Sequence, residues 1–311
     1  MVGFATTNVF GELMRTDTFP YDHFTWETNV HFLHYAGSWT VPVRWDLSDE
    51  DLEELLDSIN GIMFGGGAAP LVDHETGEHS YFYKTARRIW NYMKRQKDEK
   101  GIDWPIFGIC QGFEVIHYLA NEDAKDTLSR VEIYSQSRPL DFVVDELKGG
   151  KYTLFDPFPD ELLEKLETED INLHAHTWAI KTDTYAERAP LRDFFDILAT
   201  DEENGEEFVV AVEGKHYPVT GVMFHPETQN RHVLFTGQEG AKVGGIAGKV
   251  NNEVTDQVNF HFSEHVRRQA SKTLDTHKFA DPEFGMRMEW LNSYTGLTRA
   301  GSDTYTVSYG V

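Results

Sequence analysis

The sequence contains a single cysteine, Cys110, among its 311 residues. One thiol cannot form an internal disulfide, and it excludes zinc sites built from several cysteines. Cys110 is therefore either a small apolar residue of the core or a thiol that reacts on its own.

Long apolar runs and basic residues are also scarce. No apolar stretch approaches the roughly 20 residues that a membrane-spanning helix requires. The chain has 28 basic and 52 acidic residues, which gives a net charge of -24 and an isoelectric point near 4.9. A surface of this charge repels nucleic acids and anionic membranes, so we expect neither as a partner.

The usual marks of secretion are missing as well. Residues 1–7 lack a basic segment followed by an apolar core, and the chain contains no Asn-x-Ser/Thr sequon. No secretory signal is visible, and the sequence leaves the compartment open.

Cys110 lies between an apolar run and a helical pattern. Residues 105–109 predict a short strand, and the apolar positions of residues 113–119 predict a helix. Gly108 and Gly112 stand two residues to either side of the cysteine, which is the spacing of a nucleophile elbow. The positive end of the helix favours a thiolate at this position.

Strand and helix patterns alternate through the first 120 residues. Such alternation predicts an α/β fold with a mostly parallel sheet that is covered by helices on both faces. Ligands of these sheets bind at the carboxyl ends of the strands. We expect strands over residues 2–10, 39–43, 61–64 and 105–109, helices over 25–35, 48–59, 82–95 and 113–119, and a charged connection over 96–103.

Shorter, mixed segments follow after residue 121. A hairpin-like pair is expected over 194–198 and 208–212, joined by a charged turn over 201–207. A last strand over 217–224 runs directly into His225. Further segments are expected as strands over 131–134 and 140–144 and as a helix over 160–166.

The strand over 61–64 leads into three consecutive glycines, Gly65, Gly66 and Gly67. Such a loop can bring backbone N–H groups close to a ligand, as a phosphate cradle or as an oxyanion hole. No Lys-Ser/Thr pair follows, which excludes a P-loop. A merely flexible turn remains the alternative.

Two histidines are candidates for a general base. His225 follows an apolar strand, and Glu227 stands two residues later, where its carboxylate could orient the ring. An imidazole held in this way can take the proton of a thiol and return it to a leaving amine. His176 shares one face of an extended segment with His174, a pair that could bind a metal. No second cysteine or carboxylate on that segment supports a metal site, so we expect neither a metal nor a cofactor.

Four motifs resemble, in their order, those of the gamma-glutamyl hydrolases, which belong to the class I glutamine amidotransferase-like superfamily. The similarity covers about residues 2–270. The motifs are Phe64-Gly65-Gly66-Gly67, Gly108-Ile109-Cys110-Gln111-Gly112-Phe113-Glu114, His176-Thr177-Trp178 and Gly221-Val222-Met223-Phe224-His225-Pro226-Glu227.

The resemblance implies a role for each matching residue. Cys110 would be the nucleophile, His225 the general base and acid, and Glu227 its orienting partner. His176 would be the histidine of the His-x-Trp motif that marks these hydrolases. The implied reaction is the hydrolysis of gamma-glutamyl bonds in folyl- or antifolyl-poly-γ-glutamates through a thioester, which makes a small-molecule polyglutamate the expected partner.

The resemblance also implies groups that bind the substrate. Gly67 and the backbone N–H of Gln111 would form the oxyanion hole. Glu114 would stand near the α-amino group of the substrate, and Gly66 would line the same site. A lysosomal, vacuolar or extracellular location would follow from the family.

Three positions depart from the family pattern. Gly65 replaces a proline, Thr228 replaces a lysine after the His-Pro-Glu motif, and Asn29 replaces a tyrosine of the first helix. The first change should loosen the oxyanion loop without removing its N–H groups.

Residues 271–311 form a C-terminal extension for which we place no family counterpart. The extension is rich in methionine and aromatic residues, and residues 303–309 alternate as a strand does. We expect a catalytic domain over 1–270 and an extension that packs on its own domain or bridges subunits of a homo-oligomer, a dimer or larger.

Two other functions remain open on the sequence alone. One is a family member recruited as a structural or assembly subunit through its extension. The other is a glutaminase that passes ammonia to a synthetase.

Overall fold

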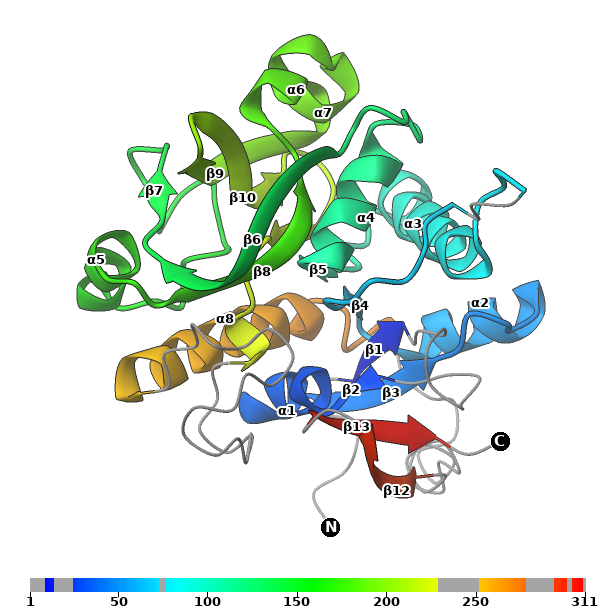
Figure 1. Ribbon diagram of the computed structural model, residues 1–311. Coiled ribbons are helices and arrows are strands. Elements are labelled where there is room, and N and C mark those ends of the chain that lie inside the picture. Colours follow the sequence, from blue (N-terminus) through cyan, green and yellow to red (C-terminus); the bar gives the residue numbers. More distant parts are fainter. Residues whose placement is uncertain are drawn as a thin grey trace.

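An eight-stranded sheet forms the centre of the molecule, in the order β3-β1-β4-β5-β11-β10-β9-β7 (Figure 1). The computed structural model describes residues 9–13, 25–72, 76–228, 252–277, 294–300 and 304–309. Strands β3 to β11 of this order are parallel, and the pairings from β11 to β7 are antiparallel. The α/β fold with a mostly parallel sheet is therefore confirmed. The strands of the sheet are β1 (Val9–Leu13), β3 (Trp39–Val43), β4 (Ile62–Phe64), β5 (Ile106–Ile109), β7 (Asp141–Phe142), β9 (Phe195–Glu203), β10 (Glu206–Gly214) and β11 (Val219–Val222).

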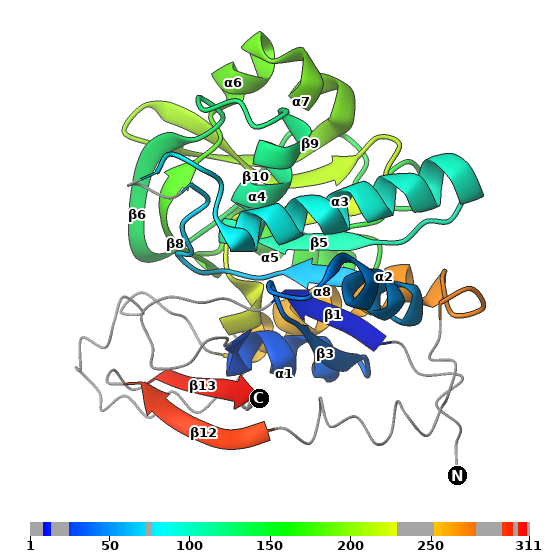
Figure 2. The ribbon, with the colours of Figure 1, turned by 90° about the vertical axis from the view of Figure 1, so that its right-hand side faces the viewer.

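Helices cover both faces of the sheet (Figures 1 and 2). Helices α1 and α8 pack together on one face, while α2, α3 and α4 form a continuous layer on the other. The central strands β4, β5 and β11 are buried along their whole length, as expected for inner strands of a sheet covered on both faces. The helices are α1 (Glu27–Tyr35), α2 (Asp49–Ser58), α3 (Tyr81–Lys100), α4 (Gln111–Ala120), α5 (Asp160–Thr168), α6 (Thr182–Glu187), α7 (Ala189–Phe194) and α8 (Glu253–Ser271).

Local sequence accounts for the ends of two helices. Ser48 caps α2 by accepting a hydrogen bond from the backbone N–H of Asp51 at 3.1 Å, as its position predicts. Helix α3 is longer than predicted: residues 96–100, expected in a charged connection, continue the helix. Gly101 ends it with a φ of 69°, a left-handed conformation that glycine adopts without strain.

The hairpin of β9 and β10 has a tighter turn than the sequence suggests. The charged turn expected over 201–207 was wrong, because β9 runs on to Glu203 and β10 begins at Glu206. Asn204 and Gly205 alone form the turn, with φ values of 55° and 81°, the pattern of a two-residue turn between antiparallel strands. Asp201 is therefore a strand residue.

Two smaller sheets lie beside the central one. Strands β6 (Ser129–Arg138) and β8 (Asn172–Ala179) form an antiparallel ribbon. Strands β12 (Tyr294–Ala300) and β13 (Thr304–Tyr309) form a hairpin, and β13 pairs with β2 (Thr25–Trp26), just before α1 (Figure 1). The predicted helix over 25–35 therefore starts two residues late, because its first two residues pair with a strand about 280 residues away in the chain. Of the first strand expected over 2–10, residues 2–8 lie outside the described residues.

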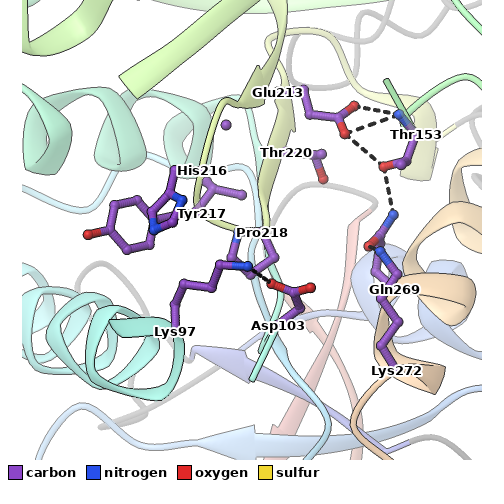
Figure 3. A pocket seen from close by; sticks show the side chains of 12 residues that line it. Lys97, Asp103, Thr153, Glu213, His216, Tyr217, Pro218, Thr220, Gln269 and Lys272 are labelled. Carbon is purple, nitrogen blue, oxygen red and sulfur yellow. Dashed lines mark hydrogen bonds and ion pairs between the residues drawn. The ribbon is translucent and has the colours of Figure 1, made fainter. Parts of the chain in front are cut away.

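The edge of the sheet opposite Cys110 carries a cavity of about 170 Å³ between the C-terminal ends of α3 and α8 (Figure 3). Its charged groups are paired: Lys97 Nζ lies 2.6 Å from Asp103 Oδ1, and Lys272 Nζ donates to the side chain of Gln269 at 2.6 Å. The carboxylate of Glu213 accepts hydrogen bonds from the backbone N–H and hydroxyl of Thr153. These bonds attach the antiparallel half of the sheet to the loop before α5.

Within the described residues, no helix is long and apolar enough to cross a membrane.

Candidate active site

Three neighbouring strands bring the candidate residues together. Strands β4, β5 and β11 are adjacent and parallel, with Phe64 opposite Gly108 and Val222 opposite Ile109. The loops that follow the three strands therefore meet at one edge of the sheet. These loops carry the glycine triplet, Cys110 and His225.

The backbone at Cys110 forms a sharp elbow. Its φ of 49° and ψ of -108° lie outside the regions that L-residues favour, at a cost of about 1–3 kcal/mol. A hydrogen bond from Cys110 N to Val222 O, at 3.0 Å, holds the elbow against the next strand. A Cβ atom at Gly112 would lie 1.6 Å from the carbonyl oxygen of Phe64, so only glycine allows the helix to start here.

His225 lies beside the thiol and is held by Glu227. The Nδ1 atom of His225 is 2.7 Å from Oε1 of Glu227, whose side chain is 3% exposed. A Cβ atom placed on Gly66 would be 2.7 Å from Cε1 of His225 and 3.5 Å from Cβ of Cys110, so both side chains border this glycine. The Nε2 atom of His225 is buried without a hydrogen-bond partner among the described residues.

The surroundings of His225 favour its charged form. Burial alone would lower its pKa, but the negative charges of a Cys110 thiolate and of the Glu227 carboxylate outweigh burial and hold the pKa well above its usual range. This environment suits a thiolate–imidazolium pair, the reactive form in thiol catalysis.

Backbone contacts fix the loop that carries His225. Its N–H donates to Leu173 O of β8 at 2.8 Å, and its carbonyl accepts from the hydroxyl of Thr228 at 3.0 Å. Asn259 of α8 donates to Pro226 O at 2.7 Å. The imidazole is thus attached to two elements besides its own strand.

The glycine loop is tied to the start of α4. The side chain of Gln111 accepts from Ala69 N at 2.9 Å and donates to Ala69 O at 2.6 Å. Gly112 N donates to Gly65 O at 3.1 Å. These bonds place the loop containing Gly67 beside the elbow. The N–H of Gln111 is the first of α4 and has no acceptor within the helix, so it can serve an incoming oxyanion.

Glu114 lies one helical turn beyond Cys110 and donates its backbone N–H to the carbonyl of Cys110 at 3.0 Å. The residue is 7% exposed, and burial raises the pKa of its carboxyl group to about 8. A carboxyl group in such surroundings ionises readily only when a cation reaches it.

His176 lies on β8, which passes the elbow: Ala175 O is 3.9 Å from Cys110 Sγ. The ring of His176 is buried next to that of His174, with His176 Nε2 and His174 Nδ1 3.2 Å apart. Burial and the charge of His225 lower the pKa of His176 to about 4. His176 therefore stays neutral at physiological pH.

Two charged residues behind His174 were not anticipated. Asp201 Oδ2 lies 3.9 Å from His174 Nε2, and Arg138 Nη1 lies 3.5 Å from the same carboxylate oxygen. The alternation of His174 and His176 points to their shared face, but no local pattern connects them to residues on β6 and β9. Among the described residues, no group of three or more histidine, cysteine or acidic side chains is arranged to hold a metal ion.

The chain has an α/β fold in which a thiol stands at a strand-to-helix elbow, with an imidazole and a carboxylate at the end of the neighbouring strand. The chain belongs to the peptidase C26 family, whose sequence profile matches residues 12–227. The family predicted from the four motifs is thereby confirmed.

Known proteins of similar sequence carry the name gamma-glutamyl hydrolase. The protein of Mus musculus is 29% identical over 279 residues, which cover 90% of this chain and 79% of the mouse protein. The protein of Homo sapiens is 34% identical over 198 residues, 64% of this chain and 58% of the human protein. Among solved structures, the glutaminase domain of Trypanosoma brucei CTPS with bound acivicin has a TM-score of 0.54 at 13% identity, covering 88% of this chain and 96% of that domain. This last likeness concerns the fold alone.

Proposed function

We propose that this protein is a cysteine hydrolase that cleaves gamma-glutamyl bonds of folyl-poly-γ-glutamates through a thioester. Membership of the peptidase C26 family and the names of its relatives support the reaction class. The observation that carries the proposal is the contact of 2.7 Å between His225 Nδ1 and Glu227 Oε1, with the imidazole beside Cys110.

In the first half of the reaction, the Cys110 thiolate attacks the γ-carbonyl carbon, and His225 carries the thiol proton. Collapse of the tetrahedral intermediate breaks the C–N bond, and Nε2 of His225 gives its proton to the leaving amine. Glu227 keeps the ring oriented, because its carboxylate accepts from Nδ1. The product of this half is a thioester on Cys110 and a free amine.

In the second half, water hydrolyses the thioester. His225, now neutral, takes a proton from the attacking water, and the thiolate leaves as the γ-carboxylate forms. The N–H groups of Gly67 and Gln111 are the proposed donors to the oxyanion of both tetrahedral intermediates.

Glu114 is the proposed neighbour of the α-nitrogen of the scissile glutamate, which is an amide N–H in a folyl-poly-γ-glutamate. Its buried carboxyl is neutral in the free protein at physiological pH because burial raises its pKa to about 8. The carbonyl oxygen of a neutral carboxyl group can accept a hydrogen bond from that amide N–H. Gly66 leaves the space between thiol and imidazole open for the scissile bond.

The other two functions lack comparable support. The similar proteins above 25% identity are named as hydrolases, whereas the glutaminase domain shares only 13% of its residues with this chain. Recruitment as an assembly subunit would leave the contacts of Cys110, His225 and Glu227 without a role.

The direct test offers purified protein two isomers of pteroyl-diglutamate, one γ-linked and one α-linked, and follows glutamate release by mass spectrometry. We expect release from the γ-linked isomer only. Ammonia release from free glutamine, with both isomers left intact, would instead identify a glutaminase. Absence of any turnover in correctly folded protein would favour the assembly subunit.

A further inference from the structure

Helix α8 carries a row of buried polar side chains at a spacing of four residues. Thr255, Asn259 and Ser263 are 0%, 0% and 1% exposed, and their spacing places them on one face of the helix. Burial of a polar group lowers stability unless a hydrogen bond compensates for the lost water. Each of the three side chains therefore needs a partner that explains its position.

Two of the three side chains attach the helix itself. Thr255 Oγ1 accepts from the backbone N–H of Asn252 at 3.0 Å and completes the capping box that begins α8. Ser263 Oγ donates to the carbonyl of Phe32 and accepts from the N–H of Ala36 at 3.0 Å. This second pair of bonds ties α8 to the neighbouring helix α1 (Figure 1).

Asn259, by contrast, reaches the loop of the candidate site. Its Nδ2 donates to the carbonyl oxygen of Pro226 at 2.7 Å, between His225 and Glu227 in the chain. Only the amide nitrogen can donate to a carbonyl, so Oδ1 points elsewhere, and it is buried without a hydrogen-bond partner among the described residues. A residue that served packing alone would not leave a buried acceptor unpaired. The bond to Pro226 is therefore what asparagine supplies at this position.

The carbonyl of Pro226 belongs to the peptide unit that leads into Glu227. Because this unit is planar, a hydrogen bond to its oxygen also fixes the direction in which the backbone enters Glu227. Oε1 of Glu227 lies 2.7 Å from Nδ1 of His225, while Oε2 is buried without a hydrogen-bond partner in the described part of the chain. The carboxylate thus depends on its own backbone to meet the imidazole, and Asn259 holds that backbone.

The backbone of His225 is held separately. Its N–H donates to Leu173 O of β8 at 2.8 Å, a bond that does not involve α8. Loss of the Asn259 bond should therefore release the carboxylate of Glu227 and leave the start of the loop attached to β8.

The charge on His225 depends on the groups around its ring. The negative charges of Cys110 and Glu227 favour the imidazolium. His174 and His176 of β8 also lie near the ring, but burial, the largest cause, lowers the pKa of both, so they stay neutral at physiological pH. A displaced Glu227 carboxylate would therefore weaken the imidazolium and, with it, the thiolate.

We propose that Asn259 is a positioning residue that holds the Pro226 carbonyl and thereby keeps the Glu227 carboxylate against Nδ1 of His225. The proposal rests on the hydrolase function proposed above. It assigns Asn259 no contact with substrate, and it makes α8 part of the support of the thiolate–imidazolium pair.

Two variants on the same face of α8 separate positioning from a merely structural role. Asn259→Leu removes the donor and keeps the size of the side chain, whereas Ser263→Ala removes buried hydrogen bonds that lead to α1. We expect kcat of Asn259→Leu to fall at least about tenfold and kcat of Ser263→Ala to stay within about threefold, since a displacement near 1 Å at reacting groups can cost about 10²-fold. KM should change by less than about threefold in both. Equal loss of kcat in the two variants would overturn the proposal.

A second background tests whether Asn259 acts through Glu227. In Glu227→Gln the carboxylate is absent, so adding Asn259→Leu should lower kcat by less than about threefold, whereas an independent effect would repeat in full. The full loss in both backgrounds would contradict the proposal. Thermal midpoints establish folding. If Asn259→Leu does not fold, Asn259→Ser, whose hydroxyl ends one bond short of Nδ2, replaces it with the same expected results.

Alkylation by iodoacetamide gives a readout without turnover, because Cys110 is the one cysteine of the chain. The thiolate is the reactive form, so the ratio of the rates at pH 6 and pH 9 reports how well the imidazolium stabilises it. We expect this ratio to fall at least about threefold in Asn259→Leu and in Glu227→Gln, and to stay within about twofold of the wild type in Ser263→Ala.

The alkylation ratio also separates this proposal from the proposed function. An unchanged ratio in folded Asn259→Leu would refute the positioning role even in an active enzyme. The expected fall in a protein that hydrolyses no γ-linked isomer would support the positioning role and place the failure in the proposed function.

Discussion

The buried carboxyl group of Glu114 should make the stability of the folded protein depend on pH. Burial raises the pKa of its carboxyl to about 8, above the ordinary value of 4.5. Between these two values the unfolded chain has lost a proton that the folded protein keeps, so this group makes stability fall as pH rises from about 4.5 to 8. Glu114→Gln removes the titrating group. We expect its thermal midpoint, relative to the wild type, to be higher at pH 8 than at pH 5. An equal difference at both pH values would show that Glu114 titrates as an exposed carboxyl does.

A substitution at Gly66 tests the placement of the His225 ring beside Cys110. In Gly66→Ala the new methyl group would lie 2.7 Å from Cε1 of His225, so the ring must shift away from Cys110. We expect kcat to fall at least about tenfold, since a displacement near 1 Å at reacting groups can cost about 10²-fold. The control is Gly150→Ala, whose Cβ meets nothing closer than 3.9 Å. Equal activity in the two variants would contradict the placement of His225.

At the scale of elements, Glu213 joins the antiparallel half of the sheet to the loop before α5. Its two oxygens accept from Thr153 N and Thr153 Oγ1 at 2.9–3.1 Å (Figure 3). They also accept from Leu154 N at 3.0 Å. In Glu213→Gln one oxygen becomes an amide group that cannot accept these bonds. We expect a loss of about 1–3 kcal/mol in the free energy of unfolding, measured by denaturant titration. Glu167→Gln, exposed on α5, is the control and should change stability by less than about 0.5 kcal/mol. Equal stability of the two variants would show that the Glu213 bonds contribute nothing.

Some elements were predictable from local sequence and others were not. The apolar runs before Gly65, Cys110 and His225 predict buried strands, and those strands are β4, β5 and β11. Strand β2 could not be predicted, because its two residues are extended only through pairing with β13. The length of β9 was missed because the charges over 201–207 suggest a loop, whereas Asn204-Gly205 supplies the turn by itself.

Some residues of the candidate site were likewise predictable from the sequence, and others were not. The residues placed by the elbow and by the strand ends follow from motifs that are contiguous in sequence. Asp201 and Arg138 lie 63 residues apart on different sheets, so only the folded chain reveals their contact with each other and with His174.

At the scale of the whole molecule, the extension belongs at least partly to the region shared with relatives. The match to the mouse protein covers 90% of the chain and leaves about 31 residues outside, fewer than the 41 residues of 271–311, so the match must reach into the extension. The division into a catalytic domain over 1–270 and an extension over 271–311 stays a prediction. Its first residues are attached to the core, since Asn60 Nδ2 donates to His277 O at 2.9 Å.

We propose that the extension helps to form a homo-oligomer and is not required for the chemistry. Light scattering should give the full chain a mass at least twice 35.7 kDa. Deleting residues 294–311 removes the hairpin that pairs with β2, and we expect it to lower that mass while kcat stays within about threefold. A full chain that is monomeric, or a truncation that keeps its mass but loses hydrolysis, would contradict this role.

The central claim is that Cys110 is the nucleophile of γ-glutamyl hydrolysis. The most direct measurement compares hydrolysis of γ-linked pteroyl-diglutamate by the wild type and by Cys110→Ala, with thermal midpoints to establish that both are folded. We predict a loss of at least about 10³-fold in kcat, in keeping with the removal of a nucleophile from other hydrolases. A folded Cys110→Ala protein that hydrolyses this substrate within about tenfold of the wild-type rate would contradict the account.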